Sequence, residues 1–418
     1  MPKARLKRPI ARFYSENMKG IAMKVLFYRY NSICEPDIAD AFRELGHNVF
    51  EITAETQRKD VTPSECVKIV SEALETRPCD FVFTVDFFPV ISEVCRAYHI
   101  HYLSWIVDSP VLELYSKSIK NNFNRIFVFD RTLCDEIKQY NPTRIFHLPL
   151  AAGIAGKSRT IGAATAADVA RFSSDVSFVG SLYTEKSVLD KLQNPPDYLR
   201  GFIDALMELQ TEIYGDYFIT NALSDEIVAD FKAHFPDFYK IPEEALCSDR
   251  LILGLFYLGY GVTAKERTRL LCMLSEKYGI NVFTASDTSK YPLINNKGAV
   301  KSLTEMPLVF ANSKINLNIT ARSIRMGIPQ RIWDVFASQG FLISNFQEEI
   351  YDYFVPGEDL IIFESAKDLD DKIAYYLEKP VLRREIAASA YEKVLKYHTF
   401  TIRVQEMLDL AFGKKAFQ

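Results

Sequence analysis

The sequence has no long hydrophobic run. Across its 418 residues no window reaches the ~18 apolar residues of a membrane span, and the most apolar stretch, Leu251 to Val262, is interrupted by three glycines. Residues 1–22 are basic but lack the apolar core of a signal peptide. We therefore expect no integral membrane segment, and we interpret residues 1–22 as a basic N-terminal extension before a folded part that begins at Met23.

Cysteine and histidine are also sparse. The seven cysteines are odd in number, scattered along the chain and never spaced as C-x-x-C. The six histidines form none of the spacings that zinc sites use. We expect reduced thiols, which are typical of a cytoplasmic protein, and we expect neither a metal ion nor another cofactor.

The motifs of several common enzyme classes are missing. No G-x-G-x-x-G follows a strand-like run, and neither G-x-x-x-x-G-K-[ST] nor G-x-S-x-G occurs. The sequence therefore lacks the motifs by which dinucleotide oxidoreductases, P-loop proteins and serine hydrolases with a nucleophile elbow are identified. The formal net charge of −4 provides no electrostatic footprint for nucleic acid, so a bound anion must be held by a local group of residues.

What the sequence does contain is a regular alternation of two patterns. Short runs rich in Val, Ile, Phe and Tyr alternate with segments whose apolar residues recur at helical spacing. This alternation predicts the α/β class, with parallel sheets covered on both faces. The expected strands are KVLFYRY, NVFEIT, DFVFTVD, YLSWIVD, RIFVFD and RIFHLP before residue 151, and VSFVGSL, INVFTAS, GAVKSL, KINLNIT, GFLISN and LIIFES after residue 174.

Changes in composition divide the chain. Residues 151–174 are rich in Ala, Gly, Ser and Thr, and we interpret them as a linker or a long surface loop. One domain is expected at residues 23–150 and a second at residues 175–400. The second domain carries a helical insertion rich in Tyr and Phe at about residues 186–278, and residues 401–418 are expected to form a C-terminal helix.

The stretch RMGIPQRIWDVFASQGFLIS, Arg325 to Ser344, combines a turn, a short helix and a strand. Pro329 suits a first helical position and Gly327 the turn before it, so the helix would offer free N–H groups to a phosphate. Asp334, one turn later, could accept hydrogen bonds from sugar hydroxyls. On spacing alone, an ordinary i,i+3 ion pair between Arg331 and Asp334 is the more frequent explanation.

Other polar residues follow expected strands, where ligands bind in open parallel sheets. Gly180 and Ser181 end the first strand of the second domain, although a plain turn there is the more frequent explanation. Thr284, Ser286 and Asp287 lie in a polar loop that could contact a base or a sugar, or could simply be solvated.

In the first domain, two apolar strands end in aspartate. Asp86 and Asp108 are each followed by proline within three residues. A carboxylate in either place could serve as a general base, and it could equally cap the next helix.

From Ser313 to Pro380 the sequence, SKINLNITARSIRMGIPQRIWDVFASQGFLISNFQEEIYDYFVPGEDLIIFESAKDLDDKIAYYLEKP, resembles the spore-maturation, CgeB-like glycosyltransferases. In the first half, FTVDFFPVIS and WIVDSP resemble the N-terminal domain that often accompanies them. The resemblance runs from about Met23 to about Arg403. It implies a GT-B fold, in which two Rossmann-like domains face each other across a cleft. It also implies that the first domain holds an acceptor, the second a nucleotide-sugar, and that a C-terminal helix returns to the first domain.

The resemblance also implies roles for individual residues. Asp334 occupies the position of a glutamate that binds ribose, and Met326 replaces an acid that usually touches the donor sugar. Arg331 would stabilise the departing diphosphate without a metal, and Asp108 would activate the acceptor hydroxyl in an inverting reaction. The residues expected to bind the nucleotide-sugar are Gly180, Ser181, Thr284, Ser286, Asp287, Arg322, Arg325, Gly327, Ile328, Gln330, Arg331 and Asp334, and those on the acceptor side are Asp86 and Asp108.

We therefore expect a glycosyltransferase that moves a sugar from a nucleotide-sugar, expected to be UDP-linked, to a hydroxyl of a glycan, protein or small molecule. Because Met326 replaces an acid, a catalytically inactive nucleotide- or glycan-binding scaffold of the same fold is an alternative. A sugar-nucleotide epimerase is a third, weaker alternative. No nucleic-acid partner is expected.

Overall fold

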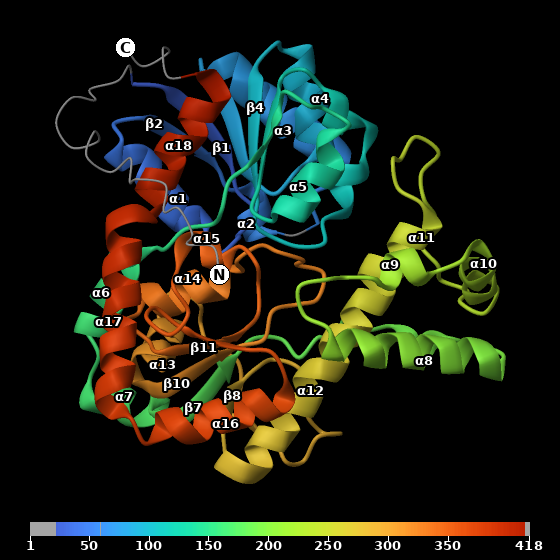
Figure 1. Ribbon diagram of the computed structural model, residues 1–418. Coiled ribbons are helices and arrows are strands. Elements are labelled where there is room, and N and C mark those ends of the chain that lie inside the picture. Colours follow the sequence, from blue (N-terminus) through green and yellow to red (C-terminus); the bar gives the residue numbers. More distant parts are fainter. Residues whose placement is uncertain (1–21, 59, 414–418) are drawn as a thin grey trace, which may run out of the picture.

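The computed structural model describes residues 22–58 and 60–413. The expected N-terminal extension therefore lies outside the described residues, apart from Ala22, as does the end of the expected C-terminal segment, residues 414–418. Figure 1 shows two α/β domains, one above the other, and a helical arm that projects from the lower one.

The first domain is built on a parallel sheet of six strands in the order β2-β1-β3-β4-β5-β6. Side chains of neighbouring residues on a strand point to opposite faces, and both faces of this sheet are apolar. Val25 and Phe27 enter one hydrophobic cluster, whereas Leu26 and Tyr28 enter another. The strands are β1 (Lys24–Tyr28), β2 (Asn48–Ile52), β3 (Phe81–Val85), β4 (His101–Ile106), β5 (Asn124–Val128) and β6 (Ile145–His147).

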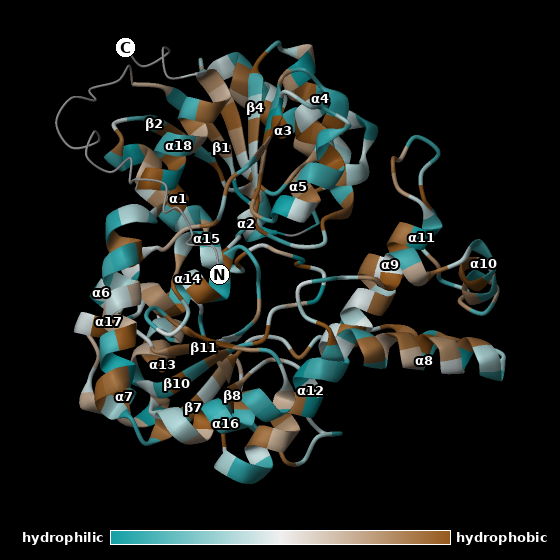
Figure 2. Cartoon of the chain, in the orientation of Figure 1, coloured by the Kyte–Doolittle hydropathy of each residue, from teal (hydrophilic) through white to brown (hydrophobic). Residues whose placement is uncertain are grey.

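The second domain repeats this construction with the strand order β12-β11-β10-β7-β8-β9, again all parallel. Its strands are β7 (Ser174–Val179), β8 (Asn281–Phe283), β9 (Asn295–Asn296), β10 (Ser313–Asn318), β11 (Leu342–Asn345) and β12 (Ile361–Phe363). Hydrophobic strands lie inside both domains, between helices that carry hydrophilic segments (Figure 2). The predicted fold class, α/β with two similar domains, is confirmed.

Helices cover both faces of each sheet. The helices of the first domain are α1 (Glu35–Glu44), α2 (Ala54–Gln57), α3 (Pro63–Thr76), α4 (Pro89–Ala97) and α5 (Arg131–Lys138). Those of the second domain outside the insertion are α13 (Met306–Asn312), α14 (Gln330–Ala337), α15 (Ile350–Tyr353), α16 (Ala366–Leu377) and α17 (Pro380–Tyr397).

The insertion is helical, as predicted, and forms the projecting arm of Figure 1. It contains α8 (Asp197–Glu212), α9 (Ile219–Ala222), α10 (Asp225–Ala233), α11 (Asp249–Leu251) and α12 (Gly259–Tyr278). A π-helical segment, Ile252–Leu258, joins α11 to α12. Aromatic side chains of the insertion, including Phe231 and Phe235, contribute to a separate hydrophobic cluster.

Two predictions of local structure are wrong. GAVKSL, residues 298–303, is not a strand, because Gly298 has φ +80°, residues 299–301 are irregular and a turn begins at residue 302. Residues 151–174 are not a loop, since they contain α6 (Ile154–Gly162) and α7 (Ala166–Phe172). Helix α7 begins with a capping box, in which Thr165 and Asp168 bond reciprocally to each other's backbone and side chain.

The C-terminal helix α18 (Phe400–Phe412) continues upward from α17 and lies beside α1 of the first domain (Figure 1). The backbone carbonyl of Ala411 accepts a 3.1 Å hydrogen bond from Nε of Arg125 in β5. Val404 and Leu408 are buried in the cluster that also contains Val25 and Phe27. The chain therefore crosses between the two domains more than once. No helix among residues 22–58 and 60–413 is long and apolar enough to cross a membrane.

Candidate functional site

The carboxyl ends of the two sheets face each other at the junction between the domains. After β4 and after β10, Ser109 and Ser323 exchange hydrogen bonds of 3.1 and 2.9 Å between hydroxyl and carbonyl groups. After β5, Asp130 Oδ2 accepts a 2.6 Å bond from the backbone N–H of Arg325. Loops at the carboxyl ends of parallel strands carry ligand sites, so this junction is the candidate functional site.

Two carboxylates form the first-domain side of the junction. Asp86 is buried and has φ +53°, and its Oδ1 accepts hydrogen bonds from the N–H groups of Val107 (2.9 Å) and Asp108 (3.2 Å). Its Oδ2 accepts a 2.5 Å bond from the hydroxyl of Tyr30. Burial, together with the negative charge of Asp108, raises the pKa of Asp86 to about 7. Asp86 therefore retains its proton far above the usual range for a carboxyl.

Asp108 is the solvent-exposed member of this pair. Desolvation raises the pKa of Asp108, whereas the positive charge of Lys186 and a hydrogen bond with Asp86 lower it. Because the negative charge of Asp108 contributes to the raised pKa of Asp86, Asp86 is the member of the pair that keeps its proton as the pH rises toward about 7. Asp108 therefore meets the electrostatic requirements of a general base.

The opposite side of the junction carries a cation above aromatic rings. Lys186, in the loop after β7, is exposed, and its Nζ lies 4.4 Å from the ring centroid of Tyr183 and 5.9 Å from that of Tyr260 in α12. Tyr183 has φ +65°. Lys186 is thus held on an aromatic base, from which its charge acts on Asp108.

Arg267 lies near this cation, with its guanidinium carbon 4.8 Å from the ring centroid of Tyr183, and Arg331 lies near Arg267. Arg267 of α12 is buried and donates to the carbonyls of Ser181 (2.6 Å) and Ile319 (3.0 Å), and it thereby ties together the ends of β7 and β10. Its positive charge and that of Arg331 act on each other. Arg331, in the first turn of α14, contacts Met306 and lies 5.3 Å from the ring centroid of Phe310.

Asp334 lies on α14 with only 3% exposure. Its Oδ1 is 3.1 Å from Lys157 Nζ of α6 and accepts a 3.1 Å bond from Nε2 of Gln330, one turn earlier. The ion pair between Arg331 and Asp334 exists, but it is loose at 3.8 Å. Asp334 Oδ2 and Gln330 Oε1 are buried without a hydrogen-bond partner among the residues described. Two acceptor oxygens on one helical face are therefore free to accept hydroxyl protons.

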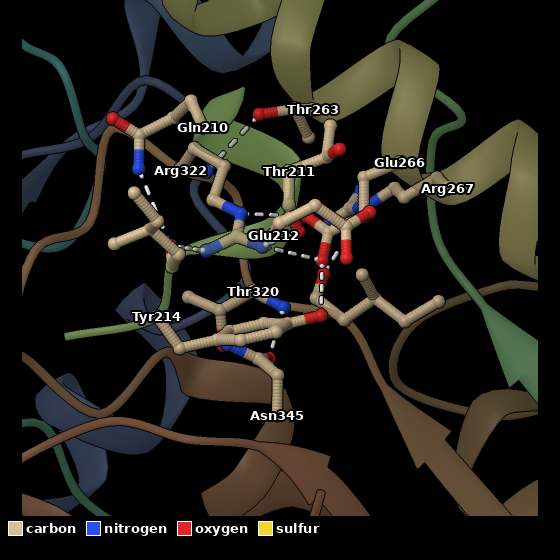
Figure 3. Close-up of polar contacts among 12 residues, drawn as sticks. Gln210, Thr211, Glu212, Tyr214, Thr263, Glu266, Arg267, Thr320, Arg322 and Asn345 are labelled. Carbon is tan, nitrogen blue, oxygen red and sulfur yellow. Dashed lines mark hydrogen bonds and ion pairs between the residues drawn. The ribbon is translucent and has the colours of Figure 1, made fainter. Parts of the chain in front are cut away.

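Arg322, expected to bind the nucleotide-sugar, is instead occupied by the protein. Its guanidinium forms two bonds with the Glu266 carboxylate, of 2.7 and 2.8 Å. It also donates to the carbonyls of Thr211 and Ile213, and it lies 4.0 Å from the ring centroid of Tyr214 (Figure 3). These partners join α8, α12 and the loop after β10, so the role that the contacts of Arg322 support is to fix the insertion to the sheet.

The turn before α14 is covered by the first domain. Arg325 Nη2 bonds to Glu136 Oε2 at 2.6 Å, so this guanidinium bridges the domains. A Cβ on Gly327 would lie 2.9 Å from the Cα of Asp130, and Ile328 is buried. The carbonyl oxygen of Met326 accepts a 3.2 Å hydrogen bond from the backbone N–H of Glu349. The structure therefore does not bring Arg325, Gly327 or Ile328 to the Lys186 side of the junction.

The polar residues after β7 and β8 mostly bond to each other. Ser181 Oγ accepts from the N–H of Tyr183 at 2.8 Å. Ser286 Oγ accepts from Leu182 N–H and donates to Glu185, both at 2.8 Å. Thr284 Oγ1 accepts from Ser286 N–H at 3.0 Å, and Asp287 is exposed in a turn with Ser289. Thr284 and Ser286 thus shape the loop after β7, and Gly180 with Ser181 forms its base.

Sequence reasoning missed four residues of the junction: Lys157, Lys186, Tyr260 and Arg267. The sequence contained a signal for Lys186, because this lysine lies six residues after Gly180, the glycine that ends a predicted strand. Lys157 stood in a segment interpreted as a linker, and Tyr260 and Arg267 lay in a long helical insertion. Within the described ranges, no three His, Cys, Asp or Glu side chains are grouped as metal ligands would be.

Comparisons with known proteins bear on the fold and on the C-terminal part of the chain. Residues 267–409, roughly a third of the chain, match a family described as glycosyl transferase-like. Among solved structures, a glycosyltransferase from Rickettsia africae ESF-5 is similar, with 11% identity, coverage of 95% of this chain and 99% of that chain, and a TM-score of 0.53. No curated protein sequence matches.

Two further solved structures have nucleotides in their names. Anabaena Alr3699/HepE in complex with UDP and glucose has 11% identity, coverage of 93% and 100%, and a TM-score of 0.50. A UDP-forming α,α-trehalose-phosphate synthase from Burkholderia xenovorans has 11% identity, coverage of 93% and 99%, and a TM-score of 0.52. At such low identity the likeness establishes the fold. The chain has the GT-B glycosyltransferase fold, and its C-terminal part matches a glycosyltransferase domain.

Proposed function

We propose that the protein transfers a sugar from a nucleotide-sugar to an acceptor hydroxyl. The observation that carries the proposal is the arrangement of Asp86 and Asp108 on one domain opposite Lys186 on the other. An inverting sugar transfer uses both elements, a base for the acceptor and positive charge for the departing diphosphate. A UDP-linked donor is part of the proposal, because two proteins of similar fold are named for UDP.

On the donor side, we assign the diphosphate to the region of Gly180, Lys186 and Arg331. A glycine allows the backbone to approach a phosphate closely, and the two cations supply charge. We assign the ribose to the free acceptor oxygens of Asp334 and Gln330, whose spacing of four residues places them on one face of α14. Lys157 then positions the Asp334 carboxylate.

On the acceptor side, Asp108 takes the proton of the acceptor hydroxyl. The acceptor oxygen forms a bond to the anomeric carbon, the bond between that carbon and the phosphate oxygen breaks, and the nucleoside diphosphate leaves with the electron pair. Asp86, held protonated by burial, keeps the second negative charge away from Asp108. This scheme describes an inverting reaction; a retaining reaction would need no base at Asp108.

The proposal includes independence from metal ions, because Lys186 and Arg331 supply the charge stabilisation that a divalent ion would otherwise supply. Membership in the CgeB-like group is proposed on the resemblance of residues 313–380. The cytoplasmic location stays a prediction.

A second candidate is a scaffold that binds a nucleotide-sugar without turnover. Two features of Met326 favour it. This residue replaces an acid of the resembled family, and its backbone N–H donates a 3.3 Å hydrogen bond to Asp130 of the first domain. The two candidates differ in whether nucleotide is released.

A panel of UDP-, GDP-, ADP- and dTDP-sugars, with and without EDTA, tests the choice. We expect one donor to raise the melting temperature and to release its nucleotide in the presence of EDTA. Stabilisation without release would favour the scaffold, and no stabilisation by any donor would contradict both candidates. Lys186→Ala should lower kcat about 100-fold, as loss of a transition-state charge partner does. Lys191→Ala, an exposed lysine nearby in the same region of the chain, is the matched control and should leave kcat unchanged.

The role of Asp108 is tested separately by Asp108→Asn. We expect transfer to fall about 100-fold or more, while the shift of melting temperature by the donor persists. Transfer near the wild-type rate would remove Asp108 from the mechanism and would favour a retaining reaction.

A further inference from the structure

A groove between the first domain and the helical insertion has no role in the scheme above. It lies between α4, residues 112–123 and the insertion loop 239–247, and its volume is about 860 Å³. Small-molecule sites usually span about 300–1,000 Å³, so this groove has room for several sugar rings.

Two lining residues of the groove follow the acceptor carboxylates closely in the sequence. Pro89, three residues after Asp86, and Leu112, four residues after Asp108, both line it. Glu113, another lining residue, acts electrostatically on Tyr260, as Asp108 does. Burial raises the pKa of Tyr260 to about 12, with contributions from Tyr183 and from the carboxylates of Asp108 and Glu113. Residues that line the groove thus belong to the same two loops that carry Asp86 and Asp108.

The insertion loop, residues 239–247, forms the far wall of the groove and is bonded to the first domain. The N–H of Leu246 donates a 2.7 Å bond to the carbonyl of Tyr115, and the hydroxyl of Tyr140 donates a 3.1 Å bond to the carbonyl of Leu246. Lys117 Nζ lies 2.8 Å from Glu244. Leu246 also packs against the hydrophobic core of the first domain. The groove is consequently a preformed feature of both domains.

The lining chemistry suits an uncharged, hydroxyl-rich chain. Three acidic and three basic side chains balance one another, so the groove offers no net charge to a polyanion. The rings of Phe123 and Tyr239 provide apolar faces, and Asn122 provides an exposed amide. Aromatic faces beside amide and charged groups bind sugar rings through their apolar C–H faces and their hydroxyls. The charged lining residues are Glu93, Glu113, Glu244, Arg96, Lys117 and Lys120.

We propose that this groove is an extension subsite for a linear, uncharged oligosaccharide acceptor, whose terminal unit reaches Asp108. The assignment of the terminal unit rests on the proposed transferase function, whereas binding along the groove does not require turnover. The protein should accordingly prefer chains of several sugar units to single sugars.

The experiment measures binding of malto-, cello-, manno- and chito-oligosaccharides of one to six units to the full-length protein in the presence of UDP. For at least one series, Kd should fall at least tenfold between one and six units. Tyr239→Ala removes an aromatic face that is 39% exposed and should weaken hexamer binding about five- to tenfold, with monomer binding unchanged. Tyr375→Ala, which removes a 52% exposed tyrosine of α16, is the matched control and should change neither.

A second variant, Ala245→Trp, fills the groove and should also abolish the length dependence, while its melting temperature reports whether it folds. The proposal is overturned if no series gains affinity with length, or if the gain persists in both groove variants. It is also overturned if only an anionic heparin hexasaccharide binds in a manner sensitive to Tyr239→Ala. Failure of nucleotide release with intact length dependence would instead contradict only the transferase proposal.

Discussion

At the scale of single residues, the pKa of Asp86 makes the stability of the protein depend on pH. Its folded-state pKa of about 7 lies above the usual 3.8, because burial disfavours the charged form. Between these values the native state binds more protons than the unfolded state, so the free energy of unfolding falls as the pH rises through this window. The loss is complete above about pH 7, where the buried carboxyl must ionise.

Asp86→Asn should remove this loss. Asparagine stays neutral, tolerates the positive φ of this position and can accept the two backbone hydrogen bonds through Oδ1. We expect the variant to be about 2–4 kcal/mol more stable than wild type at pH 8 and nearly equal to it at pH 4, in urea unfolding at each pH. Asp60→Asn, at a side chain that is 81% exposed, should show no such trend. A stability difference independent of pH would contradict the assignment.

The arginines after β10 mark a limit of prediction at this scale. All three were expected to bind the nucleotide-sugar, but the partners of a guanidinium come from distant parts of the chain. Glu266 lies 56 residues from Arg322, and Glu136 lies 189 residues from Arg325. The pattern thus located charged residues near a functional junction, and only the fold assigned two of them to structural contacts.

At the scale of elements, strands were easier to predict than the segments between them. Parallel strands buried on both faces are continuously hydrophobic, and they stand out in the sequence. Short elements carry weaker signals. The capping box at Thr165 was readable in the sequence, but the high content of small residues around it was interpreted as a linker. Helix α12 lay within the predicted helical insertion, but its individual bounds were not predicted, because its buried side includes the polar residues Thr263, Glu266 and Arg267.

Helix α18 offers an element-scale test with an internal control. Leu408 is fully buried between the helix and the first domain, whereas Leu410 on the same helix is 40% exposed. We expect Leu408→Ala to lower the free energy of unfolding by about 2–5 kcal/mol through loss of burial and formation of a cavity. Leu410→Ala should cost less than about 1 kcal/mol. Equal effects in urea unfolding would contradict the packing of α18 on the first domain.

At the scale of the whole molecule, the sequence predicted two similar domains but not the contacts that orient them. Those contacts depend on single side chains from distant strands. Glu349, after β11, is fully buried at the junction. Its carboxylate accepts a 2.7 Å bond from the N–H of Arg131 and lies 2.9 Å from Nε2 of His147, both in the first domain.

Glu349→Ala should loosen the arrangement of the domains. The substitution leaves a buried N–H and an imidazole without their acceptor, which should cost about 2–4 kcal/mol of the free energy that holds the junction together. We expect a larger radius of gyration in small-angle scattering, with each domain still folded by circular dichroism. Under the proposed function, the transferred sugar lies between Lys186 of one domain and the acceptor at Asp108 of the other, so a saturating donor should restore the compact form. Glu348→Ala, an exposed neighbour, should leave the scattering unchanged, and an unchanged radius for Glu349→Ala would show that the remaining interdomain contacts alone fix the domains.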